Sequence, residues 1–384
     1  MTRLAAAPTL AKRFAPCPAA ILRCPLTHGP LRELSADELD GLNELIESGE
    51  LLHADGSPVP HVLERGFISQ CGAFAYGQRE GIALLLPALA IPLTPQAAAQ
   101  AGRLRPEKRA VQAFYDEIGW SPSERGDASV DADNWEDLRP VSRDYIHACH
   151  LRVGRHLRPT GKYVLDVASG PVQYPEYLTY SQGYAARICI DISFAALRQA
   201  QQKLGTHGIY ILGDITNLPL ADGAVDGAVS LHTIYHTPAD EQASAFREIH
   251  RVLAPGCSAA IVYCWRSLLI KLAMLPAKVA QAPWKLMSKL FRRKTKGATS
   301  ERSRTGVYYH AHSRAWFAKN LSELPSETHT WRSIDVPMLK AYFQTWLGGR
   351  LLLRLVYQAE EWFPQLLGRW GAYPLIVVRK ENAS

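Results

Sequence analysis

The sequence predicts an α/β protein built on a doubly wound, seven-stranded sheet, with a small α+β unit before it and a helical insertion within it. From residue 161 onward, short apolar runs alternate with amphipathic segments, and Gly or Pro residues separate them. Such alternation is typical of parallel strands joined by right-handed helical crossovers. The composition, 47% hydrophobic and 21% charged, is that of a globular chain that buries a sizeable core.

The expected core elements follow one another along the chain. Strands are expected at "YVLDVA", "ARICIDIS", "GIYILGDI", "DGAVSLH" and "SAAIVYCW". Helices are expected at "PEYLTYSQGY", "FAALRQAQQKL" and "DEQASAFREIHRVL", and Pro255 and Gly256 end the last of these. The runs "HTWRSIDV" and "YPLIVVRK" then predict two final strands around a helical pair.

The rest of the chain divides by composition. We expect a disordered tail, a small unit with short apolar runs, a helical cap with the polar loop "SERGDASVDADNWED", the α/β core, a basic amphipathic lid insertion and a C-terminal segment that completes the core. These segments are 1–22, 23–93, 94–160, 161–265, 266–320 and 321–384.

Cysteine usage and hydropathy indicate the compartment. The seven cysteines are scattered and mostly lie in apolar runs, which predicts reduced, buried thiols and a cytoplasmic protein. No apolar run reaches the roughly 18 residues that a bilayer-spanning helix requires. The net charge of +7 is concentrated in 266–304, where eleven Lys and Arg residues accompany one acid, Glu301.

Acidic residues end three successive predicted strands. Asp166, Asp191 and Asp214 should therefore lie at one edge of the sheet, where open α/β sheets bind ligands. Gly170 predicts a turn at which the backbone approaches the ligand. Val172 stands where a dinucleotide loop has a glycine that gives room to a pyrophosphate. The pattern therefore favours a neutral or cationic nucleoside without phosphate.

These motifs resemble, in order and spacing, the class I S-adenosylmethionine-dependent methyltransferases with their Rossmann-like fold. The similar stretches are "VLDVASG", "ICIDIS", "ILGDI", "GAVDGAVSLHTIYH" and "REIHRVLAPGCSAAIV". The resemblance implies S-adenosyl-L-methionine as cofactor, with its methionine end at the turn, its ribose at Asp191 and its adenine at Asp214. The implied cofactor-binding residues are Asp166, Ala168, Gly170, Asp191, Ile192, Asp214, Ile215 and Leu231. Ala168 and Val172 depart from the glycines of the family.

A structural role for the acids remains an alternative. An Asp at a strand end often caps the next helix, which applies to Asp191. Thr216 and Asn217 offer turn chemistry that would engage Asp214 without any ligand.

Methyl transfer mainly requires that donor and acceptor be held together without water, and it needs a base only when the acceptor must lose a proton. The predicted catalytic residues are His232 and His236, which follow the fourth strand, and Tyr309 in "GVYYHAHSRAWF". Packing is the alternative for all three. We predict no metal at the His-x-His pair His310 and His312, because no Cys or acid is near it in sequence.

The front unit resembles the small zinc-ribbon-like domain that activates, or is fused to, some methyltransferases. Cys24 and Cys71 correspond to its cysteines, but Thr27 and Ile68 stand at the partner positions. Since structural zinc takes four ligands, the resemblance implies a degenerate, metal-free version of that domain.

The basic insertion indicates which kind of acceptor the protein uses. Lysines mixed with large apolar residues in 266–304 are typical of a segment that lies on an anionic membrane, here the inner face. A nucleic-acid-binding arm and a soluble lid are alternatives, although no RNA-reading module accompanies the basic cluster. We therefore expect a methyltransferase acting at O or C of a small acceptor, apolar or lipid-linked. An RNA base methyltransferase and a catalytically silent scaffold are the alternatives.

Overall fold

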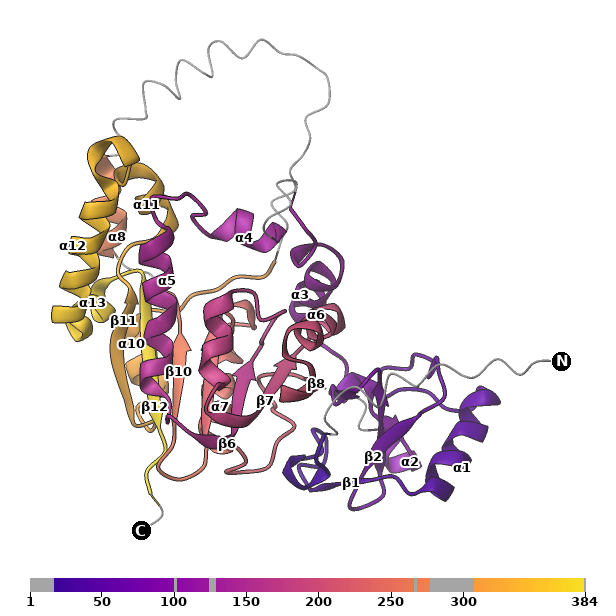
Figure 1. Cartoon of the computed structure of the whole chain (residues 1–384). Coiled ribbons are helices and arrows are strands. Elements are labelled where there is room, and N and C mark those ends of the chain that lie inside the picture. Colours follow the sequence, from indigo (N-terminus) through magenta and orange to yellow (C-terminus); the bar gives the residue numbers. More distant parts are fainter. Residues whose placement is uncertain (1–16, 100–101, 124–128, 266–267, 277–306, 383–384) are drawn as a thin grey trace, which may run out of the picture.

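The computed structural model describes residues 17–99, 102–123, 129–265, 268–276 and 307–382 (Figure 1). In this part of the chain, twelve strands form one sheet in the order β1-β2-β3-β4-β8-β7-β6-β9-β10-β12-β11, and β5 pairs with β3. The strands are β1 (Leu31–Glu33), β2 (Arg65–Ser69), β3 (Phe74–Arg79), β4 (Ile82–Leu84), β5 (Ile91–Pro92), β6 (Gly161–Val167), β7 (Tyr184–Asp191), β8 (Gly208–Leu212), β9 (Gly227–Leu231), β10 (Ser258–Val262), β11 (Ser326–Arg332) and β12 (Tyr373–Arg379). The helices are α1 (Ala36–Glu47), α2 (Pro95–Ala98), α3 (Pro106–Phe114), α4 (Val130–Trp135), α5 (Arg143–Arg152), α6 (Phe194–Leu204), α7 (Gln242–Val252), α8 (Leu268–Ala273), α10 (Arg314–Asn320), α11 (Val336–Tyr342), α12 (Gly349–Trp362) and α13 (Pro364–Trp370).

The expected strand count of seven is wrong for the sheet as a whole. Strands β6 to β12 correspond to the expected strands, but the front unit extends the same sheet instead of forming its own. Its strand β4 runs parallel to β8, with Ile82 opposite Tyr210 and Leu84 opposite Leu212. The short apolar runs of the front unit could not predict that β4 pairs with β8, because parallel pairing joins strands that are far apart in sequence.

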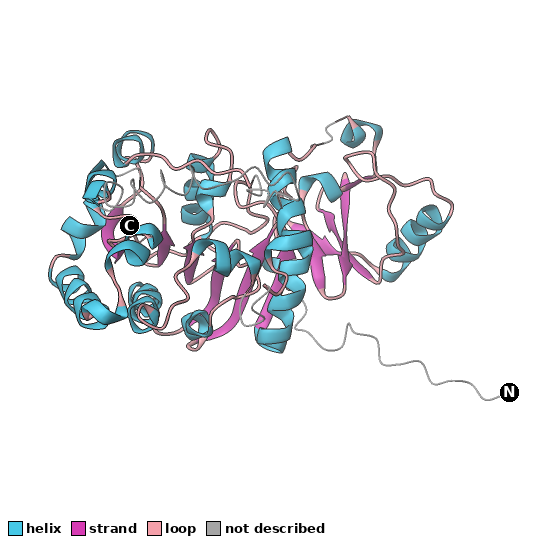
Figure 2. Cartoon of the chain, turned by 90° about the horizontal axis from the view of Figure 1, so that it is seen from above, coloured by secondary structure: helices cyan, strands magenta, loops and turns pink. Residues whose placement is uncertain are grey.

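Helices cover both faces of the sheet, as the view from above shows (Figure 2). Neighbouring strand residues point to opposite faces, so Ile188 and Ile190 of β7 enter one core and Cys189 enters the other. Helices α7 and α10 contribute side chains to the first core, and α5, α6, α11 and α12 contribute to the second. The predicted α/β architecture is confirmed, although the sheet is mixed because β11 and β12 pair antiparallel.

Two local predictions are corrected. The expected helix after the first core strand is a 3-10 helix, Pro175–Ser181. There the hydroxyls of Thr179 and Ser181 donate to the carbonyls of Glu176 and Leu178, which competes with α-helical hydrogen bonding. The expected polar loop contains α4, which begins where the Ser129 hydroxyl accepts the amide of Ala132 at 3.1 Å.

Much of the predicted insertion, residues 266–267 and 277–306, lies outside the described residues; α8 and α10 flank this stretch. In the front unit, the Cys24 sulfur lies 3.2 Å from the Tyr76 hydroxyl, and Cys71 donates to the Ser69 hydroxyl. Across the described ranges, no group of three or more His, Cys, Asp or Glu side chains is arranged to hold a metal ion. The described helices are all too short or too polar to cross a membrane.

Candidate active site

A cavity of about 370 Å³ opens at the carboxyl ends of the central strands. It lies beside β6, where the strand order reverses between β7 and β9, and such a reversal is where open α/β sheets hold ligands. Every residue that the sequence assigned to cofactor or catalysis lines it. These residues are Asp166, Ala168, Gly170, Asp191, Ile192, Asp214, Ile215, Leu231, His232, His236 and Tyr309.

The turn after β6 has an unusual backbone. Ala168, Gly170 and Val172 all have positive φ, at 54°, 53° and 51°. Only glycine adopts this region without strain, and a β-branched residue there is a rare outlier. The turn therefore keeps the backbone of a three-glycine loop although two glycines are replaced. Such strain of about 1–3 kcal/mol per residue persists where surrounding structure holds it, commonly at functional sites.

Contacts with neighbouring residues stabilise the strained backbone of this turn. Val172 is buried, and its carbonyl accepts a hydrogen bond from the Lys203 ammonium at 2.8 Å. A Cβ on Gly170 would lie 2.9 Å from the Trp120 ring, so glycine is required there for space as well as for φ.

Two of the three strand-end acids have cationic partners. Asp166 forms a fully buried ion pair with Arg187 of β7. One Asp214 oxygen lies 2.5 Å from the Lys108 ammonium, and the other accepts the amide and hydroxyl of Thr216. The turn chemistry that the sequence offered for Asp214 is thus present. The sequence around Asp166 and Asp214 could not predict these cationic partners, because each partner comes from another element.

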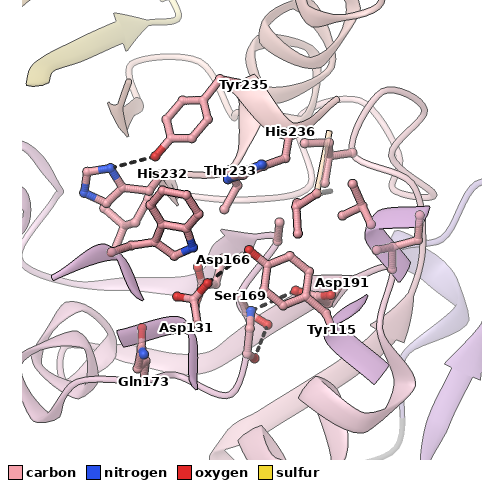
Figure 3. Close-up of a pocket in the computed structure, with 18 of the residues that line it drawn as sticks. Tyr115, Asp131, Asp166, Ser169, Gln173, Asp191, His232, Thr233, Tyr235 and His236 are labelled. Carbon is pink, nitrogen blue, oxygen red and sulfur yellow. Dashed lines mark hydrogen bonds between the residues drawn. The ribbon is translucent and has the colours of Figure 1, made fainter. Parts of the chain in front are cut away.

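Asp191 differs from both. Its carboxylate accepts the amides of Gly170 and Ser193, each at 2.8 Å, and has no ion-pair partner among the described residues (Figure 3). Burial raises the pKa of Asp191 to about 6, although the two amides favour the ionised form. Ser193 itself caps α6 by accepting the amide of Ala196, so helix capping does not explain Asp191.

The structure adds a second carboxylate that the sequence analysis missed. Asp131 of α4 lines the cavity and accepts a hydrogen bond from the Tyr115 hydroxyl at 3.3 Å (Figure 3). Burial raises its pKa to about 6, and it too has no ion-pair partner in the described part of the chain. Asp131 lay in a run read as a polar loop, and the serine cap at 129 was the available signal for a helix there.

The Tyr115 ring stacks on Trp120 at 4.9 Å, and both line the cavity beside Gly170. The indole Nε1 of Trp120 is buried without a hydrogen-bond partner among the described residues.

The histidines lie after β9. The Nδ1 atom of His236 is 2.9 Å from the Tyr308 carbonyl, and since a carbonyl only accepts, this nitrogen carries the proton and Nε2 has the free lone pair. His232 has a positive φ of 62° and contacts the Tyr235 hydroxyl through Nδ1 at 3.1 Å (Figure 3). Burial lowers the pKa of both histidines, that of His232 strongly, so both are neutral at pH 7. Tyr309 is half-exposed and donates to the sulfur of Cys264.

Aromatic residues and one buried arginine line the cavity beyond His232. The Arg332 guanidinium donates to Glu136 at 2.7 Å and lies against the rings of Trp331 and Tyr373. Its Nε is buried without a partner in the described structure. Tyr174 and Tyr177 belong to the same wall, and sequence reasoning missed this half because its residues come from elements far apart in the chain.

Residues 165–261 match the sequence profile of the methyltransferase domain. Fold, cavity and match together define the class of this domain: it is an S-adenosyl-L-methionine-dependent methyltransferase domain.

Relatives match over parts of the chain. A phthiotriol/phenolphthiotriol dimycocerosates methyltransferase of Mycobacterium ulcerans is 30% identical over 116 residues, which cover 30% of this chain and 42% of that protein. An O-methyltransferase of Aspergillus sclerotiorum is 26% identical over 168 residues, covering 41% and 62%. The chain spans less than two thirds of the length of either relative. Among solved structures, geranyl diphosphate C-methyltransferase from Streptomyces coelicolor aligns with a TM-score of 0.42 and 15% identity over 72% of this chain and 100% of that one.

Proposed function

We propose that the whole protein is an S-adenosyl-L-methionine-dependent methyltransferase that acts at O or C of a small acceptor, apolar or lipid-linked. One observation carries the proposal: the cavity at the strand ends joins two halves. One half holds two carboxylates that lack cationic partners in the described part of the chain, and the other is aromatic and holds neutral histidines.

The first half fits the cofactor. Carboxylates buried without a cation favour a positively charged ligand, and S-adenosylmethionine carries a sulfonium and an ammonium. Asp191 would accept hydrogen bonds from the ribose hydroxyls, and Asp131 would face the cationic end. Gly170 lines the cavity, and its turn would lie against the cofactor. When bound, the cofactor supplies the methyl group as an electrophile.

Ile192, Ile215 and Leu231 would pack on the nucleoside, and the acid at position 214 is expected near the adenine. Both oxygens of Asp214 are already hydrogen-bonded within the protein. The contribution of Asp214 would therefore be to fix the strand end and the Ile215 backbone rather than to bind strongly itself.

The second half suits an acceptor with a hydroxyl or an acidic C–H. His236 presents an unprotonated Nε2, which can take the proton that such an acceptor loses. Arg332 would stabilise the negative charge that develops on the acceptor. His232 and Tyr235 would orient it, and Tyr309 would form the rim.

The relatives support an apolar acceptor. One is named as a phthiotriol/phenolphthiotriol dimycocerosates methyltransferase and another as an O-methyltransferase. The basic stretch 266–304 suits an anionic membrane surface from which such an acceptor would come, and we propose a cytoplasmic protein that associates with the inner membrane face.

Mass spectrometry of cell extract incubated with the protein and a deuterium-labelled methyl donor tests this function. We expect label in a lipid or apolar metabolite, and at least about a hundredfold slower labelling when the His236→Asn variant is used. Label in RNA would replace the proposal with RNA methylation. An unlabelled extract, together with no binding of S-adenosylhomocysteine, would indicate a silent scaffold.

A further inference from the structure

Helices α12 and α13 expose an apolar surface at the end of the molecule opposite the front unit (Figure 1). Leu351 and Leu355 are 62% and 60% exposed, and Trp362 is 69% exposed. The full surface, here called the α12–α13 face, consists of Trp346, Leu347, Leu351, Leu352, Leu355, Trp362, Phe363, Leu366 and Trp370. Monomeric soluble proteins rarely expose so many large apolar side chains in one place unless the surface binds something.

The spacing shows that this exposure is built into α12. Leu351, Leu355 and Trp362 recur at intervals of four and seven residues and so share one side of the helix. Leu353 and Glu360 on the opposite side are buried against the protein. One side of the helix therefore packs on the protein, and the opposite, apolar side has no partner within the described residues.

Charge identifies the partner. Every exposed charge between residues 336 and 372 is positive, namely Lys340, Arg350, Arg354 and Arg369. The two acids of the same stretch are paired: the buried Glu360 with Arg152, and the partly exposed Glu361 with Arg152 and Arg155. A row of Leu and Trp bordered by arginines that have no ion-pair partner among the described residues matches an anionic lipid surface, where Trp occupies the headgroup region and Arg meets phosphates. Pairing of this face with a second copy would instead bring like-charged rims together.

The α12–α13 face is also connected to the cavity. The segment 333–372 that carries it joins Arg332 to Tyr373, and both of these residues line the cavity. A hydrogen bond also links α11 to the segment that follows Glu136, another residue that lines the cavity. The Arg139 guanidinium donates to the Leu339 carbonyl of α11 at 2.8 Å.

We propose that the α12–α13 face docks the protein on an anionic lipid surface and so brings the aromatic half of the cavity to a lipid-borne acceptor. The docking itself stands on the exposed face alone; its use in delivering the acceptor rests on the proposed function.

Vesicle flotation of the full chain tests the docking. The probes are vesicles of phosphatidylcholine with and without phosphatidylglycerol. We expect the protein to float with the anionic vesicles, and the variant Leu351→Ser/Leu355→Ser/Trp362→Ser to bind at least about tenfold more weakly. Arg350→Ser/Arg354→Ser should lose about tenfold in binding and most of its preference for phosphatidylglycerol.

The matched control is Leu45→Ser/Leu52→Ser/Val62→Ser, which removes three exposed apolar side chains from the front unit and should float like the unchanged protein. Binding of S-adenosylhomocysteine is measured for each variant in parallel, because it reports folding and the cofactor site independently of docking. Equal flotation of both triple variants, or no flotation of the unchanged protein, would refute the proposal. The proposal would also be refuted if the protein did not bind vesicles but formed a dimer, or a complex with another protein, that the α12 variant abolishes.

Discussion

Asp131 and Asp191 are buried carboxylates without a cationic partner among the described residues, and we propose that they make the cavity prefer a cationic nucleoside. The neighbouring acids do not share this property, since Arg187 and Lys108 neutralise Asp166 and Asp214. The sequence predicted three acids at the ends of neighbouring strands, because the carboxyl ends of parallel strands lie at the same edge of the sheet. It did not predict their cationic partners, because these approach from other elements.

Cofactor affinity should depend on pH through these two groups. Burial raises both pKa values to about 6, so each carboxylate becomes protonated as the pH falls through about 6 and then no longer attracts a cation. Titration with S-adenosylhomocysteine should show constant affinity above neutrality and a loss of up to about tenfold per pH unit per group below 6. Affinity that is flat from pH 5 to 8 would contradict this assignment.

The same pKa shifts affect stability with a defined sign. A carboxyl whose folded-state pKa is raised stabilises the fold below its unfolded pKa, near 3.9, and that stability is lost as the pH rises through about 6. Replacing Asp191 by Asn should therefore flatten the pH dependence of the free energy of unfolding between pH 4 and 6, as measured by urea denaturation.

His236→Asn tests the proposed base. The asparagine amide can still donate to the Tyr308 carbonyl, as Nδ1 does, but the Nε2 lone pair is lost. We expect kcat for a hydroxyl acceptor to fall about 10²- to 10⁴-fold while S-adenosylhomocysteine binding stays unchanged. His312→Asn is the control, because His312 bonds the Ala239 carbonyl away from the cavity. Unchanged kcat in His236→Asn would assign this histidine to packing.

At the scale of elements, propensity and capping explain what the sequence predicted well. Helix α6 occupies the residues expected for it, from the cap Ser193 to Gly205 at its end. The segments around α4 and Pro175 were mispredicted because local side-chain hydrogen bonds, rather than hydrophobic periodicity, decide their structure. That error removed Asp131 from the expected site.

Helix α3 is anchored to the sheet by one buried cation. The Lys108 ammonium lies between Asp214 and Glu241, and its side chain is only 8% exposed. Lys108→Met should leave two carboxylates facing each other and lower the free energy of unfolding by about 3–5 kcal/mol. Urea denaturation measures this, with the exposed Lys319→Met on α10 as control. A loss below 1 kcal/mol would mean that α3 is held by its apolar contacts instead.

At the scale of the whole molecule, the sheet is continuous from the front unit to the C-terminus. Ile82, Ala83 and Leu85 are fully buried at the junction, where β4 pairs with β8. The sequence predicted the parallel core from its alternating pattern, but it treated the front unit as separate, since neither strand length nor composition reveals a partner so distant in sequence.

Removal of residues 1–93 should therefore expose the edge of β8 and the apolar surface beneath it. We expect the shortened chain to aggregate or to unfold at a lower temperature, and the full chain to unfold in a single calorimetric transition. A shortened chain that unfolds cooperatively and binds S-adenosylhomocysteine normally would show that the front unit is an independent domain.

Titration calorimetry of the full chain with S-adenosylhomocysteine at neutral pH tests whether Asp191 binds the cofactor. Asp191→Asn is compared with Asp226→Asn, because Asp226 likewise accepts two backbone amides but lies outside the lining of the cavity. We expect saturable one-site binding by the unchanged protein, at least about tenfold weaker binding by Asp191→Asn, and unaltered binding by Asp226→Asn. Absence of binding by the unchanged protein, or equal affinity in Asp191→Asn, would contradict this role of Asp191.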